Sequence, residues 1–149
     1  MNDLYNVSEV RLTYERNKTN NKKMIVNSSA KIYALMRCNW EQIEYRETFK
    51  VMYLDAGNHV LGINTVALGG LANVGVDVRM ILQGALLANA QGIACCHNHP
   101  SGDEKPSFND DVITLQIWEA CKAVNIELVD HLIITPYSYY SYADYDRLK

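Results

Sequence analysis

The segment HNHPSGDEKPSFND, residues 97–110, joins a predicted strand to a predicted helix and holds the most distinctive side chains of the chain. His97 and His99 are two residues apart, so in an extended backbone both imidazoles point to the same face. Two prolines and a glycine in the middle of the segment indicate a loop. Ser107 and Asp110 then have the spacing of residues that open a helix. The segment therefore predicts a metal site at a strand-to-helix turn.

The sequence on either side predicts the elements that carry this turn. Residues 93–96 are wholly apolar, which is typical of a strand buried on both faces of a sheet. Apolar side chains at helical spacing predict a helix over residues 110–125. Residues 126–135 are then predicted as a strand, which Pro136 ends.

Upstream, the pattern alternates between strands and helices. We expect a peripheral strand in residues 1–16, a helix from Ser28 or Ser29 to about residues 38–40, a hairpin of strands 46–54 and 59–68, and a helix over residues 78–90 capped by Asp77. The tyrosine-rich tail, residues 137–145, is either an edge strand or a partner-binding surface. These elements predict a single-domain α/β protein over residues 1–149, a mixed-sheet α-β-α sandwich, with residues 1–27 as a peripheral N-terminal segment.

Composition excludes several classes of protein. With 149 residues, 48% of them hydrophobic and 21% charged, the chain can bury one core and is not disordered. A net charge of -3 argues against a generic nucleic-acid binder, and we expect the basic segment at residues 11–23 to be a solvated loop. No apolar run reaches the ~20 residues of a membrane helix, and no secretory signal is visible. We therefore expect a cytoplasmic protein with four reduced cysteines.

His97, His99 and Asp110 together offer two nitrogens and one oxygen as ligands. A catalytic zinc site has three protein ligands and an open fourth position, so this set fits one Zn²⁺ per chain. Such an ion would make a water nucleophilic at neutral pH, and a general base should lie within reach of that water. We expect a glutamate on a neighbouring strand to supply the base.

Simpler interpretations exist for each part of this set. Ser107 and Asp110 alone are a capping box, which occurs at many helices without a metal, and two histidines can lie at the surface of a strand end. A buried strand explains Cys95 and Cys96 better than a role as ligands. The letters His-Asn-His do not indicate an HNH nuclease, in which these residues are spread over a ββα unit.

The spacing of His97, His99, Ser107 and Asp110 resembles the JAMM motif of the JAB/MPN metallopeptidase superfamily. The form His-Asn-His-Pro-Ser-Gly, with Pro-Ser before the helix and Asp-His at residues 130–131, resembles the RadC branch in particular. The resemblance covers roughly residues 40–142. It implies the cytidine-deaminase-like sandwich of JAB/MPN domains and a zinc-dependent hydrolase of amide, peptide or isopeptide-type bonds, with an unidentified peptide or protein as substrate.

The resemblance also implies roles for single residues. His97, His99 and Asp110 would hold zinc, and Ser107 would orient water or stabilise the oxyanion of a tetrahedral intermediate. Glu47 matches the setting of the family's catalytic glutamate better than Glu44 or Glu41. From the residues alone, Glu47 would be expected to be a solvent-facing strand residue.

The chain also departs from the family pattern, and other functions stay open. Nothing in residues 1–40 resembles the helix-hairpin-helix region common in RadC proteins, and residues 78–80 read Val-Arg-Met where the family has Pro-Arg-Glu. Asn98 stands where deubiquitinating relatives have Ser or Thr. Alternatives are a DNA-repair or mobile-element accessory protein that binds nucleic acid, and a non-catalytic interaction module. An oligomer could form through the tyrosine-rich tail. His131 either orients a ligand or is a hydrogen-bonded core histidine, and the residues alone favour the second.

Overall fold

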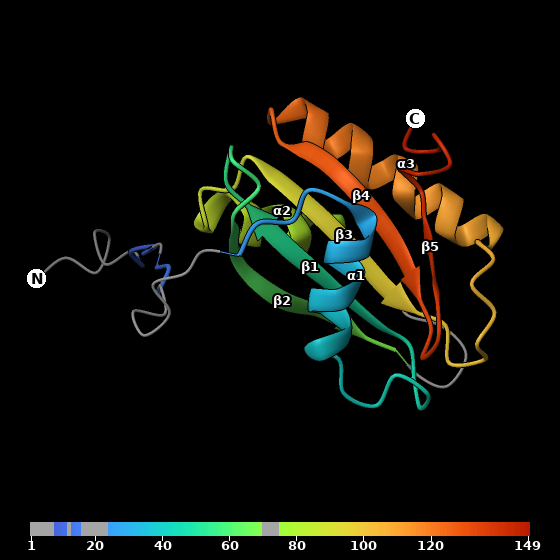
Figure 1. Ribbon diagram of the computed structural model, residues 1–149. Helices are drawn as coiled ribbons and strands as arrows, with labels where there is room; N and C mark the ends of the chain where they lie inside the picture. Colours follow the sequence, from blue (N-terminus) through green and yellow to red (C-terminus); the bar gives the residue numbers. More distant parts are fainter. Residues whose placement is uncertain (1–7, 12, 16–23, 70–74) are drawn as a thin grey trace, which may run out of the picture.

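A single five-stranded sheet lies between helices on its two faces (Figure 1). The computed structural model describes residues 8–11, 13–15, 24–69 and 75–149. The strands are β1 (Thr48–Leu54), β2 (Val60–Leu68), β3 (Gly92–Asn98), β4 (Glu127–Ile134) and β5 (Tyr139–Ser141), in the order β2-β1-β3-β4-β5. The helices are α1 (Ser29–Cys38), α2 (Val78–Leu87) and α3 (Phe108–Ala123). This arrangement confirms the predicted mixed-sheet α-β-α sandwich.

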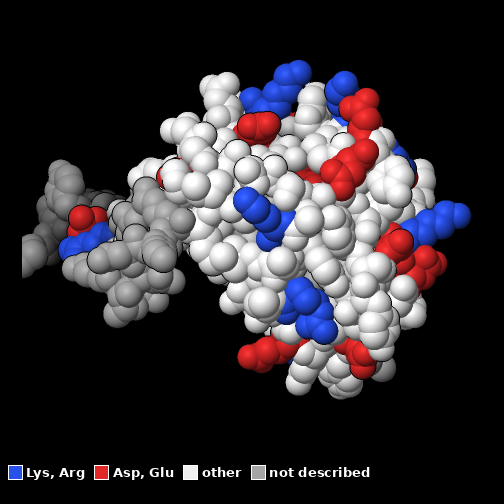
Figure 2. Space-filling model, viewed as in Figure 1, with Lys and Arg blue, Asp and Glu red and all other residues white. Residues whose placement is uncertain are grey.

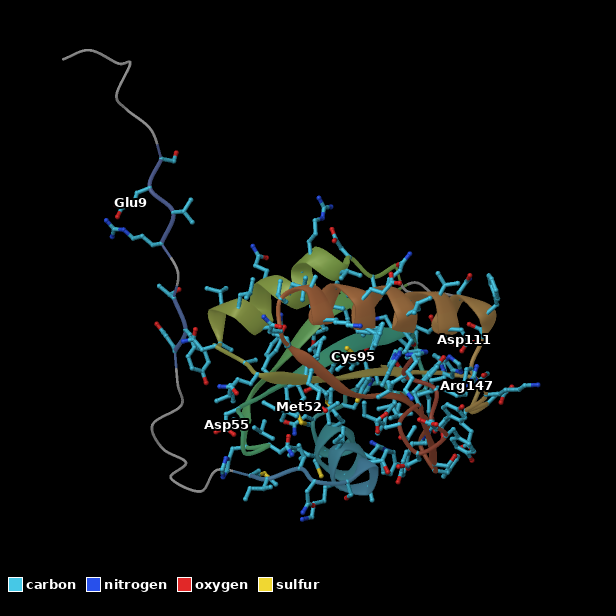
Figure 3. The ribbon with its side chains drawn as sticks, turned by 90° about the horizontal axis from the view of Figure 1, so that it is seen from above. Glu9, Met52, Asp55, Cys95, Asp111 and Arg147 are labelled. Atoms are coloured by element: carbon cyan, nitrogen blue, oxygen red, sulfur yellow. The ribbon has the colours of Figure 1, made fainter. Side chains whose placement is uncertain are left out.

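The central strand β3 is buried along its whole length. It pairs antiparallel with β1 and parallel with β4, as expected for an apolar strand in the middle of a mixed sheet. Alternate side chains enter two separate cores. Cys95 belongs to the core under α2 and α3, whereas Met52 of β1 belongs to the core under α1, and Figure 3 shows these two side chains on opposite faces of the sheet.

Several helix boundaries follow from local chemistry. Ser28 and Asp77 cap α1 and α2 as predicted, because each side chain accepts a hydrogen bond from a backbone N–H of the first turn. α3 begins at Phe108, two residues before the predicted start, since Ser107 rather than a later residue is its cap. α2 ends at Leu87 instead of residue 90, and Asn89 follows with a φ of 52°.

The strand predicted in residues 1–16 is absent from the part of it that the structure describes. Residues 8–11 and 13–15 form no strand, and Val10 is 84% exposed. Tyr14 reaches the sheet only through its hydroxyl, which donates a hydrogen bond to the Leu61 carbonyl. The remainder of this segment, and most of the basic segment at residues 11–23, lie outside the described residues.

The C-terminal tail folds back onto α3. Residues 139–141 form β5, an edge strand on β4, which confirms the first of the two interpretations of the tail. Further along, the Tyr142 hydroxyl and the Arg147 guanidinium both donate to Asp111 of α3, at 2.8 Å each. Figure 3 shows Asp111 and Arg147 facing each other at one end of the sandwich. This contact places the tail next to the turn that carries the histidines.

In the described part of the chain no helix is long and apolar enough to cross a membrane. The four cysteines are free thiols, with Cys38 exposed and the others buried. Burial raises the pKa of Cys95 and Cys96 well above the usual thiol value, so both are neutral thiols packed in the core.

Candidate metal centre

The two histidines of the opening segment lie at the end of β3, on the face covered by α3. His97 is the second-last residue of the strand and pairs with Phe49 of β1. The Phe49 ring stacks on the His97 ring with centroids 6.0 Å apart. His99 follows one residue beyond the strand, and its N–H donates to the Ile134 carbonyl at the end of β4. The pairing with β4 therefore extends past the strand and keeps both imidazoles on one face.

Asp110 approaches these imidazoles from the first turn of α3. A full capping box holds it in place, since the Ser107 side chain accepts from the Asp110 N–H and the Ser107 N–H donates to Asp110 Oδ2 at 2.7 Å. The capping box is the simpler interpretation of these two residues, and it is present. It also fixes the carboxylate next to the strand end, so the capping role is compatible with a role as a metal ligand.

Three potential ligand atoms converge at this place. His97 Nε2 lies 3.1 Å from Asp110 Oδ1 and 3.1 Å from His99 Nε2, and His99 Nε2 lies 3.4 Å from Asp110 Oδ2. One ligand atom from each residue lies within 4.8 Å of the others, a group that could hold a metal ion. The His97 side chain is 3% exposed, whereas those of His99 and Asp110 are 13% and 14% exposed. The group is thus anchored in the core and reachable from one side.

The charges of this group depend on one another. Burial alone raises the pKa of Asp110, but hydrogen bonds with His97 and His99 outweigh this effect and hold the pKa well below its usual range. Burial lowers the pKa of His99, yet the contacts with Asp110 and with the Asp103 carbonyl raise it above the ordinary value overall. The site therefore holds a carboxylate that attracts a cation, whether a proton or a metal ion.

The loop after β3 fixes the orientation of the His99 ring. His99 Nδ1 lies 2.7 Å from the Asp103 carbonyl oxygen, and because a carbonyl only accepts, Nδ1 carries a proton; in the neutral ring Nε2 then keeps its lone pair. The loop can turn back because Gly102 adopts a φ of 84°, a conformation that suits glycine. Glu104 ties the loop to the β4–β5 turn through a hydrogen bond from Ser138.

The His131 ring lies directly behind His97. It is fully buried on β4, with Nε2 2.9 Å from His97 Nδ1 and Nδ1 2.6 Å from the Thr114 hydroxyl of α3. Burial, and then the nearby His97, lower the pKa of His131 well below the usual histidine value. The ring is thus a hydrogen-bonded core histidine that also contacts a candidate ligand, so the two interpretations of His131 are compatible.

Glu47 immediately precedes β1, on the side of the sheet where the imidazoles lie. Its carbonyl accepts from the Gly69 N–H at 2.9 Å, so the extended pairing with β2 continues past the first residue of the strand. It stands two residues before Phe49, which pairs with His97, and alternation therefore places Glu47 on the His97 face. Its charge is close enough to raise the pKa of His99. The structure thus brings Glu47 to the group, half-buried rather than fully solvated.

Asn98 holds the segment that carries Glu47. Its side chain is fully buried on the opposite face from His97, where its oxygen accepts from the Thr48 N–H at 2.7 Å. Its amide donates to the carbonyls of Ile43 and Arg46, at 2.7 and 2.9 Å. Three backbone groups around Glu47 therefore depend on one amide side chain. The sequence pattern does not indicate this role.

We expect Asn98→Ala to lower the free energy of unfolding by about 3 kcal/mol, because it leaves three backbone groups, most of them buried, without their partner. Urea unfolding followed by circular dichroism measures the change. Asn109→Ala is the control, since Asn109 is exposed in the first turn of α3 and its loss should cost less than ~0.5 kcal/mol. Equal unfolding midpoints for the two variants would contradict the role of Asn98.

The Ser107 hydroxyl is engaged within the site. It donates to Asp110 Oδ2 at 2.7 Å, so its proton points to the carboxylate. A contact with water or with an oxyanion would need this hydroxyl to rotate, and that role stays a prediction.

Thr114 was missed by sequence reasoning, although its position four residues after Asp110 places both on the same helix face.

This strand-to-helix turn, with its two histidines and capped aspartate, defines a domain built around a potential metal-binding group. A family model described as RadC-like JAB domain matches residues 26–147. The chain is 36% identical over 119 residues to a UPF0758 protein of Flavobacterium johnsoniae, covering 80% of this chain and 52% of that protein. It is 35% identical over 123 residues to a UPF0758 protein of Thermotoga maritima, covering 83% and 54%. With the UPF0758 protein YfjY of Escherichia coli it shares 36% identity over 103 residues, covering 69% and 64%.

The chain belongs to the RadC-like JAB domain family. The predicted resemblance is therefore confirmed, and the match over residues 26–147 is wider than the predicted 40–142. The chain spans about half the length of the first two of these relatives. The names of the relatives assign no activity.

Proposed function

We propose that this domain is a zinc-dependent hydrolase that cleaves amide, peptide or isopeptide-type bonds with an activated water. The observation that carries the proposal is the convergence of three side chains: His97 Nε2 lies 3.1 Å from His99 Nε2 and 3.1 Å from Asp110 Oδ1, and His99 Nε2 lies 3.4 Å from Asp110 Oδ2. Two imidazole nitrogens and a carboxylate at these distances need positive charge between them, which protons supply in hydrogen bonds and which a metal ion would supply when bound. Membership in a JAB family supports the class of reaction.

The donor set fits zinc. Zinc bonds of ~2.0–2.2 Å to nitrogen and oxygen at tetrahedral angles place neighbouring ligands roughly 3.3 Å apart. Each pair of side chains already lies near this value, with His97 facing one Asp110 oxygen and His99 the other, and one ligand atom from each residue lies within 4.8 Å of the others. Two imidazoles and one carboxylate leave a fourth position, and the partial exposure of His99 and Asp110 keeps that side accessible. Zinc bound there would supply a Lewis acid and a water whose pKa is lowered from ~15.7 to ~7.

Three residues of this chain would carry out the proton transfer, the metal binding and the oxyanion stabilisation. Glu47, on the same face as the imidazoles, would take a proton from the attacking water and deliver it to the leaving nitrogen. Asp110, held by the Ser107 cap, would keep its negative charge throughout. The Ser107 hydroxyl, after rotation away from Asp110, would donate to the oxyanion that forms on the scissile carbonyl.

The nucleic-acid alternative has little electrostatic support. The net charge is -3, and the face in Figure 2 carries basic and acidic side chains interspersed with one another. Binding to phosphates depends on concentrated positive charge. The non-catalytic alternative is less favoured because the full candidate ligand set and Glu47 lie together. The natural substrate and the activity of a longer protein containing this domain would depend on segments beyond the site.

The proposal is tested by a cleavage screen. Zinc-loaded protein is incubated with quenched fluorescent peptide libraries and with peptides joined through a lysine ε-amine, and cleavage is followed by fluorescence and mass spectrometry. We expect cleavage of at least one class, its loss with a chelator, and its return with zinc. The His97→Ala protein serves as the inactive control. Equal cleavage by that control would show contamination and would contradict the proposal.

Metal affinity should depend on pH through His99. Its pKa lies above the usual 6.5, so below that pKa a proton competes with zinc for Nε2. The pKa of Asp110 is lowered, so Asp110 stays ionised and adds no competition. Affinity should therefore rise about tenfold per pH unit as pH increases and level off above the His99 pKa. Chelator competition titrations between about pH 6 and about pH 8 measure it, and a flat profile would contradict this dependence.

A further inference from the structure

We propose that His131 and Thr114 form a fixed hydrogen-bond relay that holds the neutral His97 ring in the tautomer with its proton on Nδ1. Neither residue belongs to the candidate ligand set. The relay runs from His97 Nδ1 to His131 Nε2, from His131 Nδ1 to the Thr114 hydroxyl, and from that hydroxyl to the backbone carbonyl of Asp110. It begins at one candidate ligand and ends on the backbone of another.

The direction of the relay is fixed at its Asp110 end. The Thr114 hydroxyl oxygen lies 2.6 Å from the Asp110 carbonyl oxygen. Two oxygens at this distance need a hydrogen between them, and a carbonyl has none to give. Thr114 therefore donates its only proton to Asp110. Its hydroxyl oxygen can only accept from His131 Nδ1, which lies 2.6 Å away on the other side.

The proton on His131 Nδ1 determines the tautomer of His97. His131 is fully buried, and in the described part of the chain no carboxylate hydrogen-bonds to either of its ring nitrogens, so the ring is neutral. A neutral ring with Nδ1–H presents a lone pair at Nε2. His97 Nδ1, at 2.9 Å, must then be the donor. In the neutral form of His97 the lone pair is therefore on Nε2, which faces Asp110 and His99.

Aromatic neighbours hold the two imidazole rings of the relay in their orientations. Tyr142 stacks on His131, with ring centroids 5.2 Å apart and ring planes at 10°. Phe49 contacts both imidazoles of the relay, with its centroid 5.5 Å from that of His131 and 6.0 Å from that of His97. Rotation of either imidazole would have to displace these rings. His97 is thus oriented by β4 and α3, as His99 is by its contact with the Asp103 carbonyl. Both histidines then present Nε2 to the same point.

The effect of the relay on metal binding rests on the proposed zinc site. The assignment of the tautomers follows from the hydrogen bonds alone and does not depend on zinc. Replacing Thr114 by valine preserves the side-chain shape but removes the acceptor for His131 Nδ1. His131 can then keep a hydrogen bond for its ring N–H only by moving the proton to Nε2 and donating it to His97 Nδ1. That change would place the His97 proton on Nε2, where it blocks a cation. Thr114 is not part of the converging group, and its hydroxyl hydrogen-bonds to the Asp110 carbonyl and to His131 Nδ1, so a merely structural role would not move the tautomer of His97.

The test measures the tautomers and the zinc affinity of the full chain. Long-range ¹H–¹⁵N spectra of the metal-free protein at mildly alkaline pH should show Nδ1–H on both His97 and His131. Thr114→Ser, which keeps the hydroxyl, should match the wild type. Thr114→Val should show Nε2–H on His131 and bind zinc about 10- to 100-fold more weakly in chelator competition.

An Nε2–H signal on His131 in the wild type would overturn the relay, and so would unchanged zinc affinity in a folded Thr114→Val protein. If that variant does not fold, the wild-type and Thr114→Ser spectra still decide the direction of the hydrogen bonds. Failure of the proposed function has a different signature. In that case the protein hydrolyses nothing, or binds no zinc, while the tautomers remain as described.

Discussion

The His97→Ala protein is expected to bind zinc more than ~100-fold more weakly than the wild type and to lose all zinc-dependent hydrolysis. Loss of a group that only supports a metal ligand costs 10- to 100-fold in affinity, so loss of a ligand should exceed that range. His97 is also the anchored member of the group, 3% exposed and held between Phe49 and His131. Chelator competition with chromogenic zinc indicators measures the affinity.

The chain contains a matched control for this experiment. His59 pairs with Asp55 at 2.9 Å, a partly buried histidine–carboxylate contact in the β1–β2 hairpin. The converging group includes neither residue. His59→Ala should therefore keep the zinc affinity of the wild type. If His97→Ala and His59→Ala bound zinc equally well, the assignment of His97 as a ligand would be wrong.

Glu47→Gln is expected to lower kcat by ~10² to 10⁴-fold while leaving zinc affinity within a few-fold of the wild type. Glutamine keeps the size and polarity of the side chain but cannot accept a proton from water at neutral pH. Because Glu47 contributes no atom to the converging group, the metal should stay bound. Turnover of whichever peptide the wild type cleaves, with zinc content measured in parallel, separates these effects.

Glu44→Gln is the control for this second experiment. Glu44 is exposed in the turn before β1, three residues from Glu47, and carries the same charge. Its replacement should leave kcat unchanged. An equal loss in both variants would indicate a general electrostatic effect, and retained activity in Glu47→Gln would move the general base to another residue.

Much of the site could be predicted from the sequence because its signals are local. Strand alternation places His97 and His99 on one face, and the capping spacing places Asp110 in the first turn of α3. The apolar residues before His97 mark a central strand, and β3 is central and buried. Each of these inferences depends on residues within a few positions of one another.

The contacts that position the site could not be predicted in the same way. Asn98 holds the backbone near Glu47 across about fifty residues, and His131 meets His97 only because β4 pairs with β3. Such contacts depend on sheet order and register, which a single sequence does not specify. The strand predicted in residues 1–16 is absent from residues 8–11 and 13–15, where only a loose alternation of apolar residues supported it.

The central proposal, that His97, His99 and Asp110 hold one metal ion, is tested most directly by metal analysis. Wild type and His99→Ala are purified without added metal, dialysed against a weak chelator and compared by mass spectrometry. We predict close to one zinc per chain in the wild type and almost none in a folded His99→Ala protein. Equal metal content in the two proteins, or a wild type that takes up no metal when supplied with zinc, would contradict the proposed metal site.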